Sequence, residues 1–292
     1  MNWPKRTSVV ASPFDLGGAA ASQHQRARGE IDLVAIARDG ITAPHRLYRS
    51  GCLHVRLPRP EQQGWLPMVL MNSSGGIAAG DRLDVAVAAE SGARVTIAAQ
   101  AAERFYRAGP VRTPSHLRNR IRVADGAALE WLPQETILFD DASLDRTLDI
   151  DLAGNAWFLG VETLVFGRKA MGETVRRLML RDRIRLRQDG VLKLHDAVRM
   201  DGDAEAMLTR RAVGGQANAL STLILAAPEA ESMVTPLREI FAERGTEAGV
   251  SFWNGFLLAR ILGPTSEMLR GDVIAALSLL RAGRELPRVW RC

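Results

Sequence analysis

The sequence predicts a mainly β protein: a large antiparallel or β-helix-like sheet scaffold with two helices in its C-terminal quarter. Between residues 29 and 215, short segments alternate apolar and polar residues with the period of two that marks a strand with one buried face. Asp-Gly pairs separate several of these segments, and this dipeptide is a strong signal for a hairpin turn. No alternation of strands with helices precedes about residue 216, so we expect antiparallel β-structure over residues 29–215.

The predicted strands follow one another along the first part of the chain. They cover residues 31–36, 83–87, 94–99, 129–133, 136–139 and 156–166. The first residues mix Ala, Ser, Gly and Gln without a period, which predicts a loose N-terminal leader over residues 1–27. We expect residues 28–292 to form a single β-rich domain whose helical part spans about residues 228–282.

One further predicted strand carries an unusual charge pattern. Its alternate positions place four arginines on one face, Arg181, Arg183, Arg185 and Arg187. Guanidinium groups this close repel one another unless water or carboxylates surround them. The strand is therefore either a solvated sheet face or a docking surface, for an acidic partner or for carboxylates of the chain itself. Arg183 and Arg185 are our candidates for partner binding.

Two helices are expected near the C-terminus. Thr235 suits an N-cap and Pro236 the first helical position, and Gly245 supplies a stop signal. Pro264 opens the second predicted helix. Residues 252–262, between the helices, predict a buried strand.

The second helix carries an apolar stripe with two interpretations. Leu269, Val273 and Leu277 recur at helical spacing. Such a stripe most often packs into the core, but it can also bind a partner. Trp290, a large aromatic residue in a proline-stiffened tail, joins these three side chains as a candidate for partner binding.

Composition excludes several classes of protein. The chain has 292 residues, 47% of them hydrophobic, with neither an apolar run of membrane-spanning length nor the apolar core of a signal peptide. Its two cysteines fit a cytoplasmic protein, and we expect no contact with a membrane. The net charge of +5 is carried almost entirely by arginine among 33 acidic residues, and 5% aromatic residues leave little for base stacking, so we expect no nucleic-acid binding. Five histidines without the spacing of a metal-binding pair predict no stable metal site.

The segment 72–81 reads Asn-Ser-Ser-Gly-Gly-Ile-Ala-Ala-Gly-Asp and is the most informative stretch of the chain. Its glycines and small polar residues predict a tight turn between two strands. A phosphate-binding loop would need a helix directly after it and usually a lysine, and this sequence has neither here. The loop ends in a carboxylate, Asp81.

Carboxylates are the strongest candidates for chemistry. Glu135, Asp140 and Asp141 lie close together in the sequence and could form an acid–base pair, line a polar channel or bond their own turn. A small-molecule hydrolase or isomerase on a β-sandwich, using Glu135 and Asp140, is therefore one alternative. Glu162 is a lone acid in an apolar strand, which indicates either a functional carboxylate or an ion pair with an arginine such as Arg168.

The glycine loop is one of several short motifs whose order and spacing are distinctive. Their residues are Asn72, Ser73, Ser74, Gly75, Gly76, Gly80, Gln100, Tyr106, Arg168 and Glu173, together with residues 132–137 and 287–290. In this order the motifs resemble the UreD (UreH) family of urease accessory proteins, from about residue 29 to the C-terminus. Ser73 departs from the pattern, because the family often has threonine at this position.

The resemblance implies a urease maturation scaffold or chaperone without catalytic activity. Such a protein would bind the urease apoprotein and UreF, and through UreF the GTPase UreG, with its C-terminal helical part against UreF. It would hold no tight cofactor and only transient nickel, which would pass through a water-filled route. Scattered oxygen donors suit a passing Ni²⁺, because they offset its lost hydration without trapping it. The candidate carboxylates of this path are Asp81, Glu135, Asp140, Asp141 and Glu162.

Overall fold

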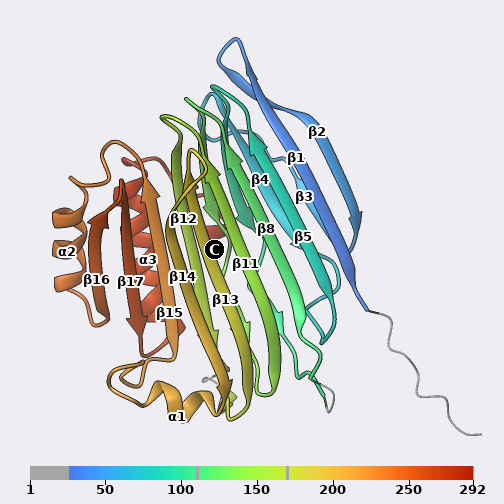
Figure 1. Cartoon of the computed structure of the whole chain (residues 1–292), viewed down its shortest axis with the longest axis vertical. Helices are drawn as coiled ribbons and strands as arrows, with labels where there is room; N and C mark the ends of the chain where they lie inside the picture. The colour runs from blue at the N-terminus through green and yellow to red at the C-terminus, as the bar shows by residue number, and fades with distance from the viewer. Residues whose placement is uncertain (1–25, 110–111, 169–170, 292) are drawn as a thin grey trace, which may run out of the picture.

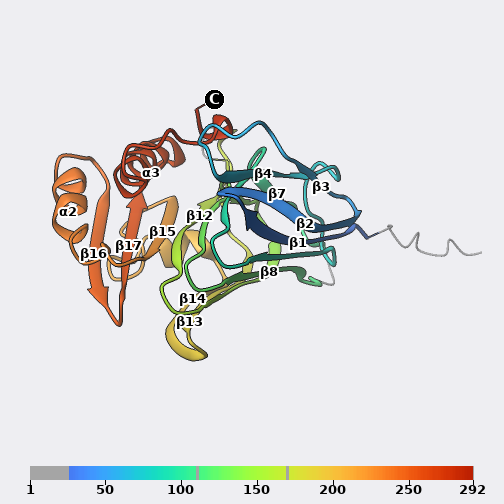
Figure 2. The same ribbon diagram turned by 90° about the horizontal axis from the view of Figure 1, so that it is seen from above.

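The computed structural model describes residues 26–109, 112–168 and 171–291. These residues form two β-sheets that pack face to face, with the longer helices at one end (Figure 1 and Figure 2). The mainly β class, with helices in the C-terminal quarter, is confirmed. Most of the predicted leader, residues 1–27, and Cys292 lie outside the described residues.

The described residues contain a seven-stranded sheet, here called sheet A, and a ten-stranded sheet, here called sheet B. In spatial order, sheet A consists of β14 (Val191–Gly202), β13 (Leu178–Gln188), β11 (Ala142–Leu152), β8 (Ser115–Val123), β5 (Arg82–Ala89), β1 (Arg28–Arg38) and β2 (Ile41–Gly51). The main path of sheet B consists of β16 (Glu247–Trp253), β17 (Phe256–Gly263), β15 (Ala219–Ala226), β12 (Trp157–Phe166), β9 (Ala128–Leu132), β6 (Arg94–Ala99), β4 (Trp65–Asn72) and β3 (Leu53–Arg56). Two short strands lie beside β12: β10 (Thr136–Leu138), and next to it β7 (Glu103–Phe105).

Neighbouring strands in the middle of both sheets are parallel. From β4 to β13 the chain passes repeatedly from one sheet to the other, so that β5, β8, β11 and β13 align in sheet A and β4, β6, β9 and β12 align in sheet B. This coil matches the β-helix-like part of the prediction. The expectation of antiparallel pairing throughout residues 29–215 is wrong for this region. Antiparallel pairs lie toward the sheet ends, such as β1 with β2 and β13 with β14.

The Asp-Gly signals explain this difference. Asp39-Gly40 and Asp189-Gly190 close the two hairpins of sheet A, with positive φ at both residues of each pair. Asp125-Gly126 instead connects β8 of sheet A to β9 of sheet B. An Asp-Gly pair predicts a turn, but it does not say which sheet the next strand joins.

The C-terminal quarter contains α2 (Val234–Ala242) and α3 (Ser266–Leu280), and the chain also forms a short α1 (Ala204–Leu208) and a 3-10 turn, Arg288–Trp290. The predicted helix starts are off by one or two residues. The N-cap of α2 is Met233, not Thr235, and α3 follows the N-cap Thr265, whose hydroxyl accepts a hydrogen bond from the backbone N–H of Met268 at 3.2 Å.

The single strand predicted over residues 252–262 is a hairpin in the structure. Strands β16 and β17 pair in antiparallel fashion around Asn254 and Gly255, which have φ of 52° and 88°. An Asn-Gly pair with positive φ at both residues is the preferred two-residue hairpin turn. It divides the apolar segment into two strands, although the apolar pattern alone predicts one.

Two apolar cores hold these layers together. The larger fills the space between the sheets and includes Ile97 and Leu148, and the smaller packs sheet B against α2 and α3 and includes Leu223 and Leu269. Figure 2 shows α3 on the side of sheet B that faces away from sheet A. The central strands β12 and β15 are therefore covered on both faces, whereas the outer face of sheet A is open.

Candidate functional site

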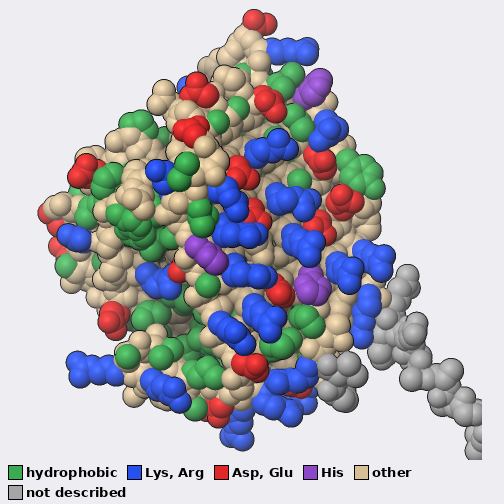
Figure 3. All heavy atoms as spheres, in the orientation of Figure 1, with side chains coloured by type: hydrophobic (Ala, Val, Ile, Leu, Met, Phe, Trp, Pro, Cys, Tyr) green, Lys and Arg blue, Asp and Glu red, His purple; other side chains and the backbone are tan. Residues whose placement is uncertain are grey.

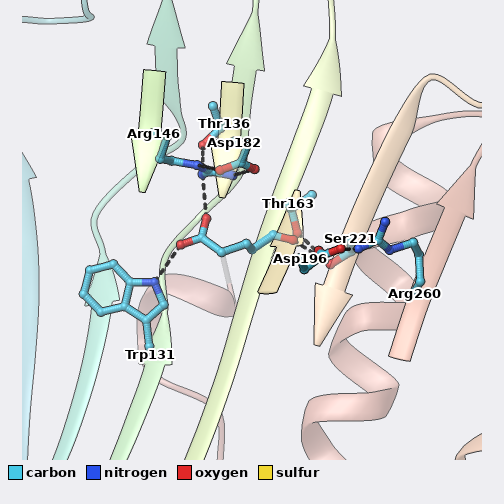
Figure 4. A network of polar contacts seen from close by, with 9 residues as sticks. Trp131, Thr136, Arg146, Thr163, Asp182, Asp196, Ser221 and Arg260 are labelled. Carbon is cyan, nitrogen blue, oxygen red and sulfur yellow. Dashed lines mark hydrogen bonds and ion pairs between the residues drawn. The ribbon is translucent and has the colours of Figure 1, made fainter. Parts of the chain in front are cut away.

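A cluster of three charged side chains lies between the two sheets. Arg146 of β11 and Asp182 of β13 are register partners in neighbouring parallel strands, so both side chains point inward from sheet A. Glu162 projects toward them from β12 of sheet B (Figure 4). Arg146 binds Asp182 through Nε and Nη2 at 2.8 and 2.6 Å, and its Nη1 lies 2.5 Å from Oε2 of Glu162. We call Arg146, Glu162 and Asp182 the buried triad.

Polar neighbours complete the hydrogen bonds of the buried triad. The indole Nε1 of Trp131 donates to Oε1 of Glu162 at 2.8 Å, and Nη1 of Arg146 donates to the hydroxyl of Thr136 at 2.9 Å. Figure 4 shows further polar contacts on neighbouring strands, including the hydroxyl pair of Thr163 on β12 and Ser221 on β15 at 2.9 Å. The buried triad has two carboxylates for one guanidinium.

The electrostatics of the buried triad follow from this imbalance. Burial raises the pKa of Glu162 and outweighs the attraction of Arg146, while the nearby charge of Asp182 raises it further. Burial alone would lower the pKa of Arg146, but Asp182 and Glu162 more than offset it, so the pKa of Arg146 is raised and the guanidinium stays charged. The interior therefore holds two carboxylates beside one guanidinium, and burial favours the protonated form of Glu162.

A second polar site lies at the glycine loop. Asn72, Gln100 and Glu103 line a cavity of about 150 Å³ together with Gly75 and Gly76. Nδ2 of Asn72 donates to Oε2 of Glu103 at 3.2 Å. Burial raises the pKa of Glu103, and the hydrogen bond from Asn72 opposes this only in part. We call this cavity the loop pocket.

Glu103 was not among the residues predicted from the sequence. It lies on β7, where it is the register partner of Thr136 on β10, and Thr136 is the residue that Arg146 binds. Glu103 of the loop pocket and Thr136 beside the buried triad are therefore neighbours on adjacent strands. The only signal in the sequence was an acid between the motif residues Gln100 and Tyr106, and nothing there indicated that it would be half-buried.

The loop owes its conformation to close packing with Tyr106. The hydroxyl of Tyr106 donates to the carbonyl of Gly75 at 3.0 Å, and a Cβ at Gly76 would lie 2.3 Å from the Tyr106 ring. The side chain of Asn72 accepts hydrogen bonds from the backbone N–H of Ser74 at 3.0 Å and from its hydroxyl at 2.6 Å. Ser73 donates its hydroxyl to the carbonyl of Cys52 at 3.1 Å. The glycine-loop residues and Tyr106 therefore form one unit in space.

Asp81 fastens the far end of the same loop. Its carboxylate is buried and accepts backbone hydrogen bonds from Ala27 and Ala78, each at 2.8 Å. Gly80, with φ of 84°, provides the bend just before it. The hydrogen bonds of Asp81 tie the loop to the start of β1.

Asp140 and Asp141 hold a neighbouring loop. Asp140 accepts hydrogen bonds from the backbone N–H groups of Arg176 and Arg177, both at 2.9 Å. Asp141 is buried, adopts φ of 64° and accepts a hydrogen bond from Nε of Arg112 at 3.2 Å. This agrees with the turn interpretation made from the sequence, although it leaves a role in a polar path open to test.

Arg168 and Glu173 form an ion pair beside this loop, with Nε of Arg168 donating to Glu173 at 2.8 Å. Burial would raise the pKa of Glu173, but hydrogen bonds from Arg168 and from the backbone N–H of Asp140 lower it. The guanidinium of Arg168 also covers the ring of Phe139, which packs edge-on against Tyr106. The interpretation of Glu162 as the partner of an arginine is confirmed, but the arginine is Arg146 and not Arg168.

Arg270 of α3 joins Glu135 to the C-terminal tail. Nη1 of Arg270 donates to the carboxylate of Glu135 at 2.8 Å, while Nη2 of Arg270 donates to the carbonyl of Trp290 at 3.2 Å. Glu135 and Asp140 therefore have different partners, and no hydrogen bond or ion pair joins them within residues 26–109, 112–168 and 171–291. Each carboxylate is engaged in holding the fold, Glu135 by Arg270 and Asp140 by the backbone of residues 176 and 177.

The apolar candidates for partner binding are core residues. Leu269, Val273 and Leu277 are no more than 1% exposed, and Trp290 is 3% exposed and donates Nε1 to the carbonyl of Leu132 at 3.0 Å. The stripe on α3 therefore packs onto sheet B and is not accessible to a partner.

Metal-binding clusters and membrane-spanning helices are both absent from the described residues. The part of the chain that the structure describes contains no group of three or more His, Cys, Asp or Glu side chains placed to hold a metal ion. Among the same residues, none of the helices combines the length and apolar character that crossing a bilayer requires.

Comparison with known proteins identifies the family. Residues 27–291 match the family model described as UreD urease accessory protein. The chain is 46% identical over 283 residues to the urease accessory protein UreD of Rhodopseudomonas palustris strain HaA2, covering 97% of this chain and 99% of that protein. It is 44% identical over 278 residues to urease accessory protein UreD 1 of Bradyrhizobium sp. strain ORS 278, covering 94% and 98%. The chain belongs to the UreD family of urease accessory proteins.

Proposed function

We propose that the chain is a cytoplasmic scaffold of urease maturation that binds the urease apoprotein and UreF, the latter with the GTPase UreG, and gives nickel a polar path toward urease. Membership of the UreD family supports the role in urease maturation, and the family consists of accessory proteins rather than catalytic enzymes. The named partners and the nickel path go further than the family name. The observation that carries the nickel path is the excess of carboxylate over cation in the buried triad.

A path for Ni²⁺ must lower the cost of dehydration without holding the ion. When Glu162 is ionised, the buried triad has a net negative charge in the interior, which attracts a cation because charge is poorly screened there. Arg146 contacts both carboxylates and so prevents them from closing around an ion as a complete ligand set. Such a site favours passage over storage.

The loop pocket is our proposed entrance to this path. Its amide and carboxylate oxygens, from Asn72, Gln100 and Glu103, are hard donors of the kind that suit a hydrated divalent cation. Asp81, Glu135, Asp140 and Asp141 remain candidates, but each also holds a loop or the tail in place through the hydrogen bonds described above. A variant at any of these four would change structure and path together.

Replacing Glu103 by glutamine tests the path with little change in shape. Glutamine keeps an acceptor for Asn72 but removes the charge, so we expect nickel in urease to fall about tenfold, on the scale of one lost charge interaction of about 1.4 kcal/mol. The chain is co-expressed with the urease apoprotein, UreF and UreG, and nickel per urease is measured by atomic absorption. Glu90→Gln, at an exposed site in the turn between β5 and β6, is the matched control.

Co-purification of the complex separates the possible outcomes. The proposal predicts that Glu103→Gln recovers as much urease and UreF as wild type while delivering less nickel. Normal nickel content in urease would exclude the loop pocket from the path. Loss of the complex in parallel with nickel would give Glu103 a structural role instead.

A further inference from the structure

The open face of sheet A is built from three charged columns. Arginines of β8 and β13 flank a column on β11 in which aspartates predominate (Figure 3). The register sets them in rows: Asp145 lies between His116 and Arg181, and Asp149 lies between Arg120 and Arg185. Strands are about 4.8 Å apart, so each carboxylate of the central column can reach a neighbouring guanidinium.

One row of this pattern has no carboxylate in its centre. Thr147 occupies the place on β11 between Arg118 and Arg183, one strand away on either side. The surface is hollowed at this row. A depression of about 420 Å³ is lined by His116, Arg118, Arg120, Asp145, Thr147, Asp149, Arg183 and Arg185. We call it the Thr147 hollow.

The Thr147 hollow has more positive than negative charge. Four arginines face two aspartates, and the aspartates are engaged: Asp145 pairs with Arg183, and Asp149 pairs with Arg185 at 2.6 Å. The guanidinium of Arg118 forms no hydrogen bond or ion pair with any other residue in the described ranges, and the same holds for the hydroxyl of Thr147. An anion above Thr147 would therefore meet the unpaired guanidinium of Arg118 on β8 and, on β13, the guanidinium that Arg183 shares with Asp145.

We propose that the Thr147 hollow recognises a carboxylate side chain on an acidic segment of a partner protein. The partner's carboxylate would occupy the position that an aspartate occupies in the adjacent rows, between two guanidinium groups that match it in charge and geometry. A polyanion such as nucleic acid fits less well, because its evenly spaced phosphates would also meet Asp145, Asp149 and Asp151 on the same column. This inference concerns the outer face of sheet A and does not depend on the nickel path.

The test uses the purified full chain and a ten-residue peptide of alternating Thr and Glu, with the Thr-Gln peptide as the neutral comparison. Calorimetry at low salt should show the acidic peptide binding at least about tenfold more tightly than the neutral one, with the difference reduced at high salt. Thr147→Asp places a carboxylate of the chain itself in the hollow. It should abolish the tenfold preference and raise Tm, whereas Thr147→Asn should keep the preference.

Two double variants separate the hollow from the general charge of this face. Arg118→Gln with Arg183→Gln should remove the preference. Arg122→Gln with Arg199→Gln removes the same charge from exposed positions on the same face outside the hollow, and should leave most of the preference intact. Equal loss in both double variants, or an unchanged preference in Thr147→Asp, would overturn the proposal.

Two other anions identify the occupant. Inorganic phosphate and a single-stranded oligonucleotide are titrated against the same variants. Phosphate that binds as tightly as the acidic peptide would make the hollow a small-anion site, and an oligonucleotide that binds more tightly and is lost in Thr147→Asp would make it a nucleic-acid site. Either result contradicts a partner carboxylate, and weak binding of both supports it.

Discussion

Strands β11 and β13 carry register-matched charged pairs on both of their faces, and the two sets differ in their access to water. On the inner face, the side chains of Arg146 and Asp182 are 4% and 8% exposed. On the outer face, those of Arg185 and Asp149 are 38% and 22% exposed. The residue types and the strand spacing are the same, so the difference comes only from which side of the sheet each position faces.

This difference changes what each pair contributes. An exposed pair gains little, because water already solvates both groups, and its net contribution is about 0–1 kcal/mol. A buried pair has lost that solvation, so removal of one partner leaves a charge that nothing compensates. Residues of the outer pairs can therefore be replaced, or can bind a partner protein, at small cost in stability. Replacing a residue of the buried triad costs much more.

The largest expected effect comes from removing the buried cation. Arg146→Met leaves Glu162 and Asp182 buried without a partner, and we expect the free energy of unfolding to fall by about 3–5 kcal/mol. Arg185→Met, the matched change on the outer face, should cost about 1 kcal/mol or less. Urea denaturation measures the free energy of unfolding of both variants. Equal losses would show that burial of the pair does not determine its contribution to stability.

Adjacent glycines of the loop allow a second comparison of constrained and open positions. Gly76→Ala would drive a methyl group into the Tyr106 ring, and we expect a loss of about 1–3 kcal/mol. Gly75 has φ of 77°, and no atom lies within 4 Å of the place that a Cβ would take, so Gly75→Ala should cost only about 1 kcal/mol from backbone strain. Thermal unfolding measures both variants. A larger loss at Gly75 would contradict the packing against Tyr106.

The smallest expected effect on stability concerns Glu162. Because burial raises its pKa, the folded chain keeps a proton that the unfolded chain loses as pH rises above the ordinary value of 4.5, and wild-type stability falls through that range. Glu162→Gln removes this dependence and leaves Arg146 paired with Asp182. Its stability relative to wild type should therefore increase between pH 5 and pH 8, by on the order of 1 kcal/mol.

Urea denaturation at several pH values tests this sign. Glu90→Gln, at an exposed position, is the control and should show no such trend. A decrease in relative stability with rising pH would mean that ionised Glu162 stabilises the fold through Arg146, and the carboxylate would then not be in excess.

Local pattern predicted strands at β1, β5, β6, β9, β10, β12 and β13, the two C-terminal helices and the face of β13 that carries the arginines. It did not predict the strands β2, β8, β11, β14 and β15. It could not predict which strands pair, because a turn signal such as Asp125-Gly126 is the same whether the chain reverses within one sheet or crosses to the other. The hairpin around Asn254 was not predicted, because the apolar residues on both sides of the Asn-Gly turn resemble one continuous buried strand.

The candidate site was predicted only in part for the same reason. Glu162 stood out as a lone acid in an apolar strand, but its partner Arg146 is set by the register of three strands and not by sequence distance. Glu103 was not predicted, because its place beside Asn72 and the glycine loop depends on tertiary structure. The apolar stripe of Leu269, Val273 and Leu277 was correctly predicted to lie on a helix. Only the packing of α3 on sheet B shows that it belongs to the core.

The nickel content of urease matured with the Glu162→Gln chain tests the central claim most directly, because this change removes the excess interior charge and retains the ion pair of Arg146 with Asp182. Metal is measured per urease at equal recovery of the complex, with Glu90→Gln in parallel. We predict a folded chain, an intact complex and about tenfold less nickel. Wild-type nickel content in urease from an equally stable complex would contradict the account.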